Sequence, residues 1–254
     1  MNTLTIEKKK GYAIIQLDNG KVNAINTELA RDLKQVFLDF EADETVKGII
    51  LTGRPHGFSA GLDVMEMATS DLETSKEFWR QYMSALRAMV HFSKPFICAI
   101  TGYAPAGATI LTLCADYRIM GQGPKHVVGM HEFKMSMLVP EMLCDIYAYY
   151  LGEKKAWSAV LERQLFNSDQ AVEMGLVNES VAVEEVLPLA EKKMKQALQV
   201  LPAIFKENKK YLRKELNKIV DQDIEAKVEG FAHFIESNPE LIEMTKMFMA
   251  SLRK

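Results

Sequence analysis

The sequence lacks the motifs through which many enzymes bind phosphates, dinucleotides or metal ions. No glycine-rich loop ends in Lys-Ser or Lys-Thr, and no G-x-G-x-x-G follows a predicted strand. His131-Glu132 is not followed by the second histidine of a zinc-binding helix, because position 135 is methionine. The five histidines show no metal-ligand spacing. These absences argue against chemistry that needs a metal or a dinucleotide, and we expect no metal and no bound cofactor.

Cysteine is scarce, and its placement does not suggest disulfides. Cys98, Cys114 and Cys144 are odd in number, far apart, and each lies in an apolar stretch. Cysteines of this kind usually behave as small hydrophobic side chains in a reducing compartment. We therefore expect all three to be buried and unpaired.

The chain also lacks an excess of charge and long hydrophobic runs. It has 31 basic and 34 acidic residues, a formal net charge of −3, so bulk charge favours neither nucleic acid nor an anionic membrane as partner. No apolar run could span a bilayer, no basic-then-apolar leader follows Met1, and the final residues, SLRK, are not a peroxisomal signal. We expect a soluble cytoplasmic protein that binds neither nucleic acid nor membranes.

What is present is an alternation of short apolar runs with amphipathic segments. Apolar runs typical of strands lie at 12–18, 48–52, 96–101, 117–120, 126–130 and 176–181. Segments from Thr27 and around Phe78 repeat apolar residues at helical spacing, and only helices are expected after residue 183. The sequence therefore predicts an α/β core at 1–195 and a helical region at 196–254 that packs on the core or on a neighbouring subunit.

Two turns made of small residues stand out. Ser-Ala-Gly at 59–61 and Ala-Gly-Ala at 106–108 each follow a predicted strand and precede a predicted helix. Small side chains leave backbone N–H groups free to point at a ligand, and a helix amino terminus adds partial positive charge. Two such turns side by side would form an oxyanion hole, although on spacing alone the simpler interpretation is two tight turns that ease packing.

Six stretches occur together in a characteristic order and spacing. They are KVNAIN (21–26), GFSAGLD (57–63), KPFICAITGYAPAGA (94–108), CADYRIM (114–120), GMHE (129–132) and AVEMGLVNESV (171–181). This ordered set resembles the crotonase family, the enoyl-CoA hydratase/isomerase superfamily. The resemblance implies a spiral of ββα units with a C-terminal helical region, assembled as a homotrimer or as a hexamer of two trimers.

The resemblance also implies a substrate and a site. The substrate would be an acyl-CoA thioester, whose carbonyl oxygen would bind to the N–H groups of Ala60 and Gly107. The stretch 21–26 and the loop before Ala60 would line the CoA channel. The residues expected to contact substrate are Val22, Ala24, Ile25, Ser59, Gly61, Leu62, Asp63, Ala106, Ile110 and His131. Coenzyme A would enter as part of the substrate, so no separate cofactor is implied.

The number of carboxylates at the site bears on the reaction. Family members that add water to a double bond are similar in carrying two glutamates, and the corresponding positions here hold Ile110 and Glu132. Two carboxylates hold and activate water, whereas one carboxylate beside an apolar residue moves a proton between two carbons. The resemblance therefore implies a Δ3,Δ2-enoyl-CoA isomerase of fatty acid β-oxidation, most like the mitochondrial-type subgroup, with Glu132 as the catalytic proton shuttle.

Two alternatives stay open at this point. One is a hydratase, or another acyl-CoA-processing crotonase enzyme, that uses Glu132 alone; the other is a scaffold that binds acyl-CoA or a protein partner without turnover. Three residues also depart from the subgroup: His131 replaces an asparagine, Ala108 a glycine and Thr109 a cysteine. An imidazole beside Glu132 would change the pKa or the orientation of the carboxyl group.

Overall fold

Strands and helices alternate up to residue 181 in the computed structural model, which describes residues 1–241, 243–244 and 247. The strands are β1 (Leu4–Lys8), β2 (Ala13–Leu17), β3 (Ile49–Thr52), β4 (His56–Gly57), β5 (Phe96–Ile100), β6 (Gly102–Pro105), β7 (Tyr117–Gly121), β8 (Val128–Gly129) and β9 (Glu179–Val181). The helices are α1 (Thr27–Ala42), α2 (Val64–Thr69), α3 (Leu72–His91), α4 (Gly107–Leu113), the 3-10 helix η1 (Glu132–Met135), α5 (Glu141–Leu151), α6 (Glu153–Leu161), α7 (Ser168–Glu173), α8 (Val183–Ala197), α9 (Pro202–Leu212), α10 (Lys214–Val220) and α11 (Ile224–Ser237).

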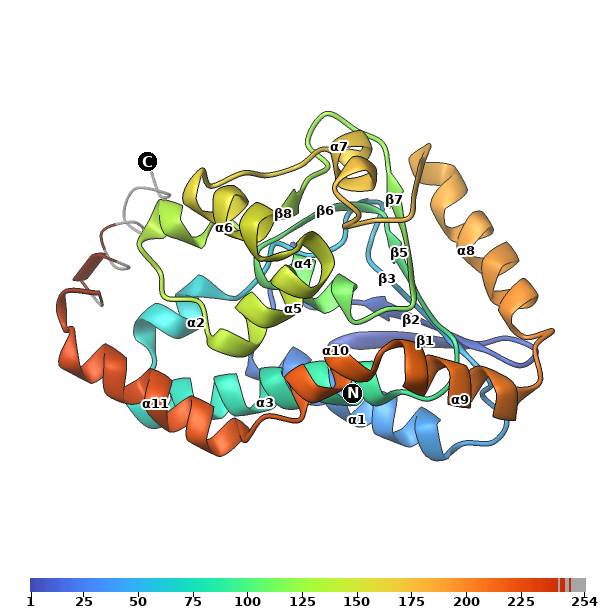
Figure 1. Ribbon diagram of the computed structural model, residues 1–254, viewed down its shortest axis with the longest axis horizontal. Helices are drawn as coiled ribbons and strands as arrows, with labels where there is room; N and C mark the ends of the chain where they lie inside the picture. Colours follow the sequence, from blue (N-terminus) through green and yellow to red (C-terminus); the bar gives the residue numbers. More distant parts are fainter. Residues whose placement is uncertain (242, 245–246, 248–254) are drawn as a thin grey trace.

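A six-stranded sheet of order β1-β2-β3-β5-β7-β9 forms the centre of the molecule. Only the β1–β2 pair is antiparallel, and strand β1 is not predicted from the sequence. Successive side chains alternate between the two faces. Ile14, Ile50 and Ile97 pack under α8, which covers one face in Figure 1. Residues one position along each strand, such as Ile15 and Leu51, belong to the larger core on the other face.

A second, smaller sheet has the order β4-β6-β8 and parallel strands only two to four residues long. Each strand follows a strand of the large sheet and precedes a helix, so β3-β4-α2, β5-β6-α4 and β7-β8-η1 are successive ββα units. The predicted spiral of ββα units is therefore confirmed. The sequence predicts only loops at 53–63 and 102–106, because β4 has just two residues and β6 begins with glycine and ends with proline, which are typical of turns.

Helices α1 and α3 pack against each other below the large sheet (Figure 1). The helical spacing seen in the sequence places Leu29, Leu33 and Phe37 of α1 in the core. Asn26 caps α1, since its side chain accepts a hydrogen bond from Leu29 N–H at 2.9 Å. Gly152, with φ +75°, ends α5 as the sequence predicts.

A half-buried ionic cluster attaches the C-terminal helices to the core. Lys209 Nζ of α9 lies 2.8 Å from Asp116 Oδ2 and 3.1 Å from Lys94 O. Arg213 Nη1 lies 2.5 Å from Asp116 Oδ1. The predicted division at residues 195 and 196 falls inside α8, which packs on β3, β5 and β7, and it stays a prediction.

The three cysteines differ in their exposure to solvent. Cys98 and Cys114 are buried, but Cys144 is exposed, so the prediction that all three are buried is wrong. The reason is helical geometry: Leu143 and Tyr147 point into the core, and Cys144 is turned away from them.

Among the described residues, no helix has the length and apolar character needed to cross a membrane.

We predict that Gly102→Ala lowers the free energy of unfolding by at least about 2 kcal/mol, because a Cβ would lie 2.1 Å from the carbonyl carbon of His56 in the paired strand β4. Gly230→Ala is the matched control, since it lies in exposed α11 and a Cβ added there would have no other atom within 4 Å. That change should raise stability by about 0.5–1 kcal/mol. Urea unfolding of both variants measures the difference, and equal stability would contradict the β4–β6 pairing.

Candidate active site

Buried polar groups hold the first small-residue turn. Ser59 Oγ donates to Asn23 O at 2.6 Å and accepts from Gly61 N–H at 3.2 Å. Asn23 Nδ2 donates to Phe58 O at 3.0 Å. Residues 57–61 also spell G-x-S-x-G, the pattern of a hydrolase nucleophile. Ser59 is fully buried and its hydroxyl is used in the turn, so it supports the backbone instead of acting as a nucleophile.

The N–H of Ala60 is already used inside the protein. It donates to Val22 O at 2.9 Å, so the prediction of Ala60 as a free oxyanion donor is wrong. A short parallel bridge between Ile25 and Leu62 explains why. Ile25 N–H donates to Gly61 O and Asp63 N–H donates to Ile25 O, which directs the N–H of Leu62 away from the bridge. Within the described chain, Leu62 N–H donates to no other residue.

The second turn presents the N–H of Gly107. Ala106 has φ +55° and ψ −128°, a conformation that L residues rarely adopt, and its N–H donates to Gly129 O at 2.8 Å. Gly107 then begins α4, so its N–H has no intrahelical acceptor, and no other acceptor is found in the described chain. A Cβ on Gly107 would lie 2.4 Å from Leu62 Cδ2 and 3.2 Å from Tyr82 Oη. A side chain at position 107 would therefore require the Leu62 side chain to move.

The two turns meet. A Cβ on Gly61 would lie 2.9 Å from Pro105 O and 3.8 Å from Gly107 N. Gly61 itself has φ +89°, which favours glycine. The unpaired N–H groups of Leu62 and Gly107 thus belong to two backbones in direct contact. This arrangement is suited to binding one oxygen atom between two donors.

Glu132 is a buried carboxyl group whose two oxygens are not both hydrogen-bonded within the described chain. It is 3% exposed, begins η1, and its Oε2 has no hydrogen-bond partner in the described part of the molecule. Burial raises its pKa to about 7, against a smaller lowering by the backbone N–H groups of Glu132 and His131. The carboxyl group therefore exchanges a proton near neutral pH, as a general base must.

His131 does not place a positive charge beside Glu132 at neutral pH. Burial, and then Lys134, lower the pKa of the His131 imidazole. Its Nδ1 is buried with no partner among the described residues. The pKa of the Glu132 carboxyl group is lowered by the backbone N–H of His131, so the predicted effect of the imidazole on this carboxyl group stays a prediction.

Tyr82 and Ile110 complete the surroundings. Tyr82 Oη, from α3, donates to Gly107 O at 2.6 Å, and the charge of Glu132 contributes to raising the pKa of this buried phenol. The second turn is hydrogen-bonded to the segment that leads to Glu132, because Ala106 N–H donates to Gly129 O at 2.8 Å. Ile110 is fully buried in α4 and belongs to the main core. Sequence reasoning placed Tyr82 only as a helical core residue, although a buried tyrosine usually signals a hydroxyl with a partner.

The remaining residues expected at the site differ in whether they pack against the first turn. Ile25 is buried and pairs with Leu62, which brings the stretch 21–26 against the first turn. Val22 is 41% exposed and Ala24 is half-buried. The Asp63 carboxylate caps α2, accepting from Met65 N–H and Glu66 N–H at 3.0 Å each. Its side chain is therefore committed to the helix.

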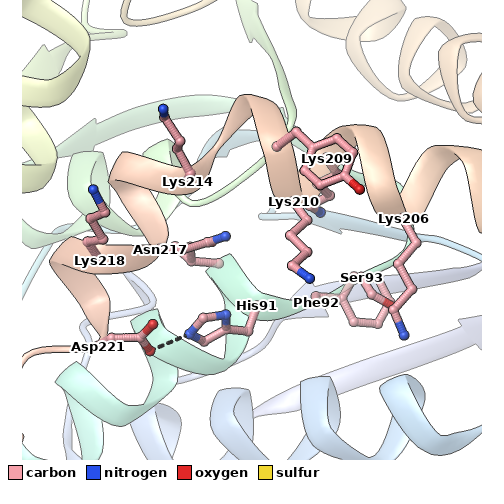
Figure 2. Close-up of a pocket in the computed structure, with 12 residues that line it drawn as sticks. His91, Phe92, Ser93, Lys206, Lys209, Lys210, Lys214, Asn217, Lys218 and Asp221 are labelled. Atoms are coloured by element: carbon pink, nitrogen blue, oxygen red, sulfur yellow. Dashed lines mark hydrogen bonds and ion pairs between the residues drawn. The ribbon is translucent and has the colours of Figure 1, made fainter.

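A basic groove lies elsewhere, between the end of α3 and helices α9 and α10 (Figure 2). Its volume is about 750 Å³, and Lys206, Lys210 and Lys214 line it. His91 Nε2 lies 2.7 Å from Asp221 Oδ1 at one end of the groove. The groove adjoins the amino end of β5, whereas the two turns follow the carboxyl ends of β3 and β5. It contains none of the residues expected at the site.

The comparisons with known proteins give the class. The family model "Enoyl-CoA hydratase/isomerase" matches residues 7–250, so the chain belongs to the enoyl-CoA hydratase/isomerase family. It is 28% identical to mouse mitochondrial enoyl-CoA delta isomerase 1, over 98% of this chain and 86% of the mouse protein. A putative enoyl-CoA hydratase of Thermus thermophilus is 31% identical over 76% of this chain and 78% of that protein.

A solved structure shares the fold along the whole chain. The crystal structure of human mitochondrial delta3-delta2-enoyl-CoA isomerase superimposes with a TM-score of 0.93 at 26% sequence identity. The match covers 99% of this chain and 98% of the human one. The resemblance predicted from six short stretches is therefore confirmed over nearly the full length.

We predict that Glu132→Gln makes the protein more stable relative to wild type as pH rises. The folded pKa of about 7 exceeds the ordinary 4.5. The wild type therefore has its full stability below pH 4.5 and loses up to about 3 kcal/mol by the time the pH has passed 7, whereas glutamine does not titrate.

Urea unfolding between pH 4.5 and 8.5 tests this expectation. The free-energy difference between Glu132→Gln and wild type should grow through that interval and then level off. Glu173→Gln, at an exposed position at the end of α7, is the control and should give a difference that stays within about 0.5 kcal/mol. A constant difference for Glu132→Gln would mean that the carboxyl group is solvated.

Proposed function

We propose that the protein is an enoyl-CoA isomerase that moves the double bond of a 3-enoyl-CoA to the conjugated 2-position. The observation that carries the proposal is Glu132, a buried carboxyl group with a pKa of about 7 and one oxygen that is unpaired within the described chain. It follows by three residues Gly129, whose carbonyl oxygen accepts from Ala106 N–H in the second turn. The similarity to enoyl-CoA delta isomerases along the whole chain supports it. As an enzyme of the crotonase family, it would take an acyl-CoA thioester as its substrate.

The two donors in this proposal are the N–H groups of Leu62 and Gly107. Removing the proton at C2 of the thioester puts negative charge on the carbonyl oxygen, and two fixed N–H donors stabilise that charge where it develops. Losing one such donor typically costs about 3–4 kcal/mol of transition-state stabilisation. Ala60, whose N–H is bound to Val22 O, keeps a role in shaping the turn.

Glu132 would carry the proton in both directions. Its ionised form takes the proton from C2, and the electrons of that C–H bond move into a dienolate spread from the carbonyl oxygen to C4. The protonated carboxyl group then returns the proton to C4, which leaves a double bond between C2 and C3. No net electron transfer and no second reactant are required, so one acid–base group suffices.

Ile110 explains the preference for isomerisation over hydration. Hydration needs a water molecule held and activated, which two carboxylates do well. Ile110 places a fully buried apolar side chain on α4, where a family hydratase is expected to carry its second acid. The neighbourhood of Glu132 would consequently hold water poorly.

Assembly stays a prediction. A homotrimer or a hexamer is expected from the resemblance, and exposed apolar side chains on α9 and just before it, including Leu201 and Leu212, offer a surface for it. No residue of the basic groove is needed for the proton transfer described above.

We predict that Glu132→Gln lowers kcat for isomerisation by about 10²–10⁴, the usual range for a positioned acid–base group. In the wild type, kcat/KM should rise about tenfold per pH unit below pH 7 and level off above it, because the base must be ionised. The conjugated thioester formed from a 3-enoyl-CoA is followed spectrophotometrically. Unchanged isomerase activity in the glutamine variant would overturn the assignment of Glu132.

The same assay separates the alternative functions. The wild type is supplied with a 3-enoyl-CoA in one reaction and a 2-enoyl-CoA in another, and the products are separated chromatographically. If the main product is a 3-hydroxyacyl-CoA, the protein is a hydratase, which is the activity named for the Thermus thermophilus relative. Binding of both thioesters without either product identifies a scaffold.

We predict that Ile110→Glu raises the ratio of hydration to isomerisation by at least about tenfold, because it supplies a second acid–base group that can hold water. Ile110→Gln is the matched control: it introduces a polar group of the same length that cannot take up a proton. An equal ratio in the two variants would show that polarity alone, and not the second carboxylate, alters the reaction.

A further inference from the structure

Thr109 has an unusual set of contacts for a residue in the first turn of a helix. It is 1% exposed, and its Oγ1 accepts from Gly129 N–H at 2.7 Å while it donates to Ala104 O at 2.7 Å. Gly129 O lies 3.3 Å away as a second acceptor. One hydroxyl group therefore connects β6, α4 and β8, which are separate segments of the chain.

These contacts lie within the β6–β8 ladder. In the β6–β8 ladder, Ala104 N–H donates to Val127 O at 2.8 Å and Ala106 N–H donates to Gly129 O at 2.8 Å. In a regular parallel ladder Gly129 N–H would donate to Ala104 O, but here it donates to the Thr109 hydroxyl group. The Thr109 hydroxyl group thus lies between the N–H of one strand and the carbonyl oxygen of the other, and it satisfies both.

The hydrogen bond between Thr109 and Gly129 joins the segment that begins at Gly107 to the segment that leads to Glu132. Gly107, which offers the N–H donor, precedes Thr109 by two residues, and Glu132 follows Gly129 by three. Ala106 is held at φ +55°, a strained conformation that surrounding contacts must maintain. Glu132 Oε2 accepts no hydrogen bond within the described chain, so the position of this carboxyl group depends chiefly on its backbone.

We propose that Thr109 is a positioning residue that fixes the Gly107 N–H relative to Glu132. It acts through Gly129 and touches neither the substrate nor the reacting atoms. This inference rests on the proposed isomerase function for its kinetic consequence. Its structural consequence, the alignment of the Gly107 N–H with a bound thioester oxygen, is measurable without turnover.

Thr109→Val tests the kinetic consequence. Valine has nearly the same shape but no hydroxyl group, so it should lower kcat about 10–100-fold, as small misplacements of catalytic groups do, while KM changes less than about threefold. Thr109→Ser keeps the hydroxyl group and should restore kcat to within about threefold of wild type. An equal loss of kcat in the valine and serine variants would overturn the proposal.

Thr112→Val is the matched control. Thr112 lies one turn further along α4, is also 1% exposed, and its hydroxyl group only donates to Thr109 O at 2.7 Å within the same helix. Removing this hydroxyl group removes a buried hydrogen bond without touching β8. Losses of kcat that match those of Thr109→Val would show a general effect on folding and would overturn the positioning role.

The structural consequence is read from the infrared carbonyl stretch of a saturated acyl-CoA labelled with carbon-13 at the thioester carbonyl. Binding to the wild type should lower this frequency, because N–H donors polarise the carbonyl group. Thr109→Val should return the frequency part of the way to that of free acyl-CoA, and Thr109→Ser and Thr112→Val should not. An unchanged frequency in Thr109→Val overturns the inference.

The two measurements separate failure of the inference from failure of the proposed function. If the wild type lowers the carbonyl frequency but does not isomerise a 3-enoyl-CoA, the isomerase proposal fails, and the frequency series across the variants still decides the role of Thr109. If the wild type isomerises and all the variants match it, the proposed function stands and the positioning role is overturned.

Discussion

Gly61 lies so close to the carbonyl group of Pro105 that a side chain at position 61 would come within 2.9 Å of that oxygen. A side chain on Gly107 would likewise meet Leu62 at 2.4 Å. The two turns can approach only because both contact points are bare backbone. The N–H donors, the packing of Leu62 and the path of α4 all depend on this approach. The smallness of the residues is thus a condition for the site as well as for the turns.

Glu132 shows how a functional group is kept at the expense of stability. A buried carboxyl group with an unpaired oxygen is unfavourable when ionised, and it persists because the surrounding fold is stable enough to hold it. Full compensation by hydrogen bonds would return the pKa towards its ordinary value and make the group a weaker base at neutral pH. The same lack of partners accounts for both the lost stability and the reactivity.

The sequence indicated the large elements because their side chains repeat with a regular period. Buried strands such as Ile49–Thr52 and amphipathic α1 were predictable on that basis. In the small sheet only β8 was, within the apolar run at 126–130; β4 is too short to show a pattern, and β6 contains glycine and proline. The donor at the first turn was assigned to Ala60 through the resemblance, and matching short stretches does not show where an N–H points. Its direction is set by the bridge between Ile25 and Leu62, a contact between distant segments. Glu132 was identified through resemblance alone, and its unpaired oxygen needed the structure.

The cluster of Lys209, Arg213 and Asp116 has a consequence for how the chain behaves as a whole. Lifting α9 from the core would leave the Asp116 carboxylate and two cations without their partners in a poorly solvated place. Asp116 also accepts a hydrogen bond from Phe96 N–H, at the start of the strand that leads to Gly107. Fraying of the C-terminal helices would therefore be transmitted to β5 and to the turn beyond it. The C-terminal helices and the turn at Gly107 should therefore unfold together in one cooperative transition. Detachment of these helices would distort the turn before the rest of the large sheet unfolded.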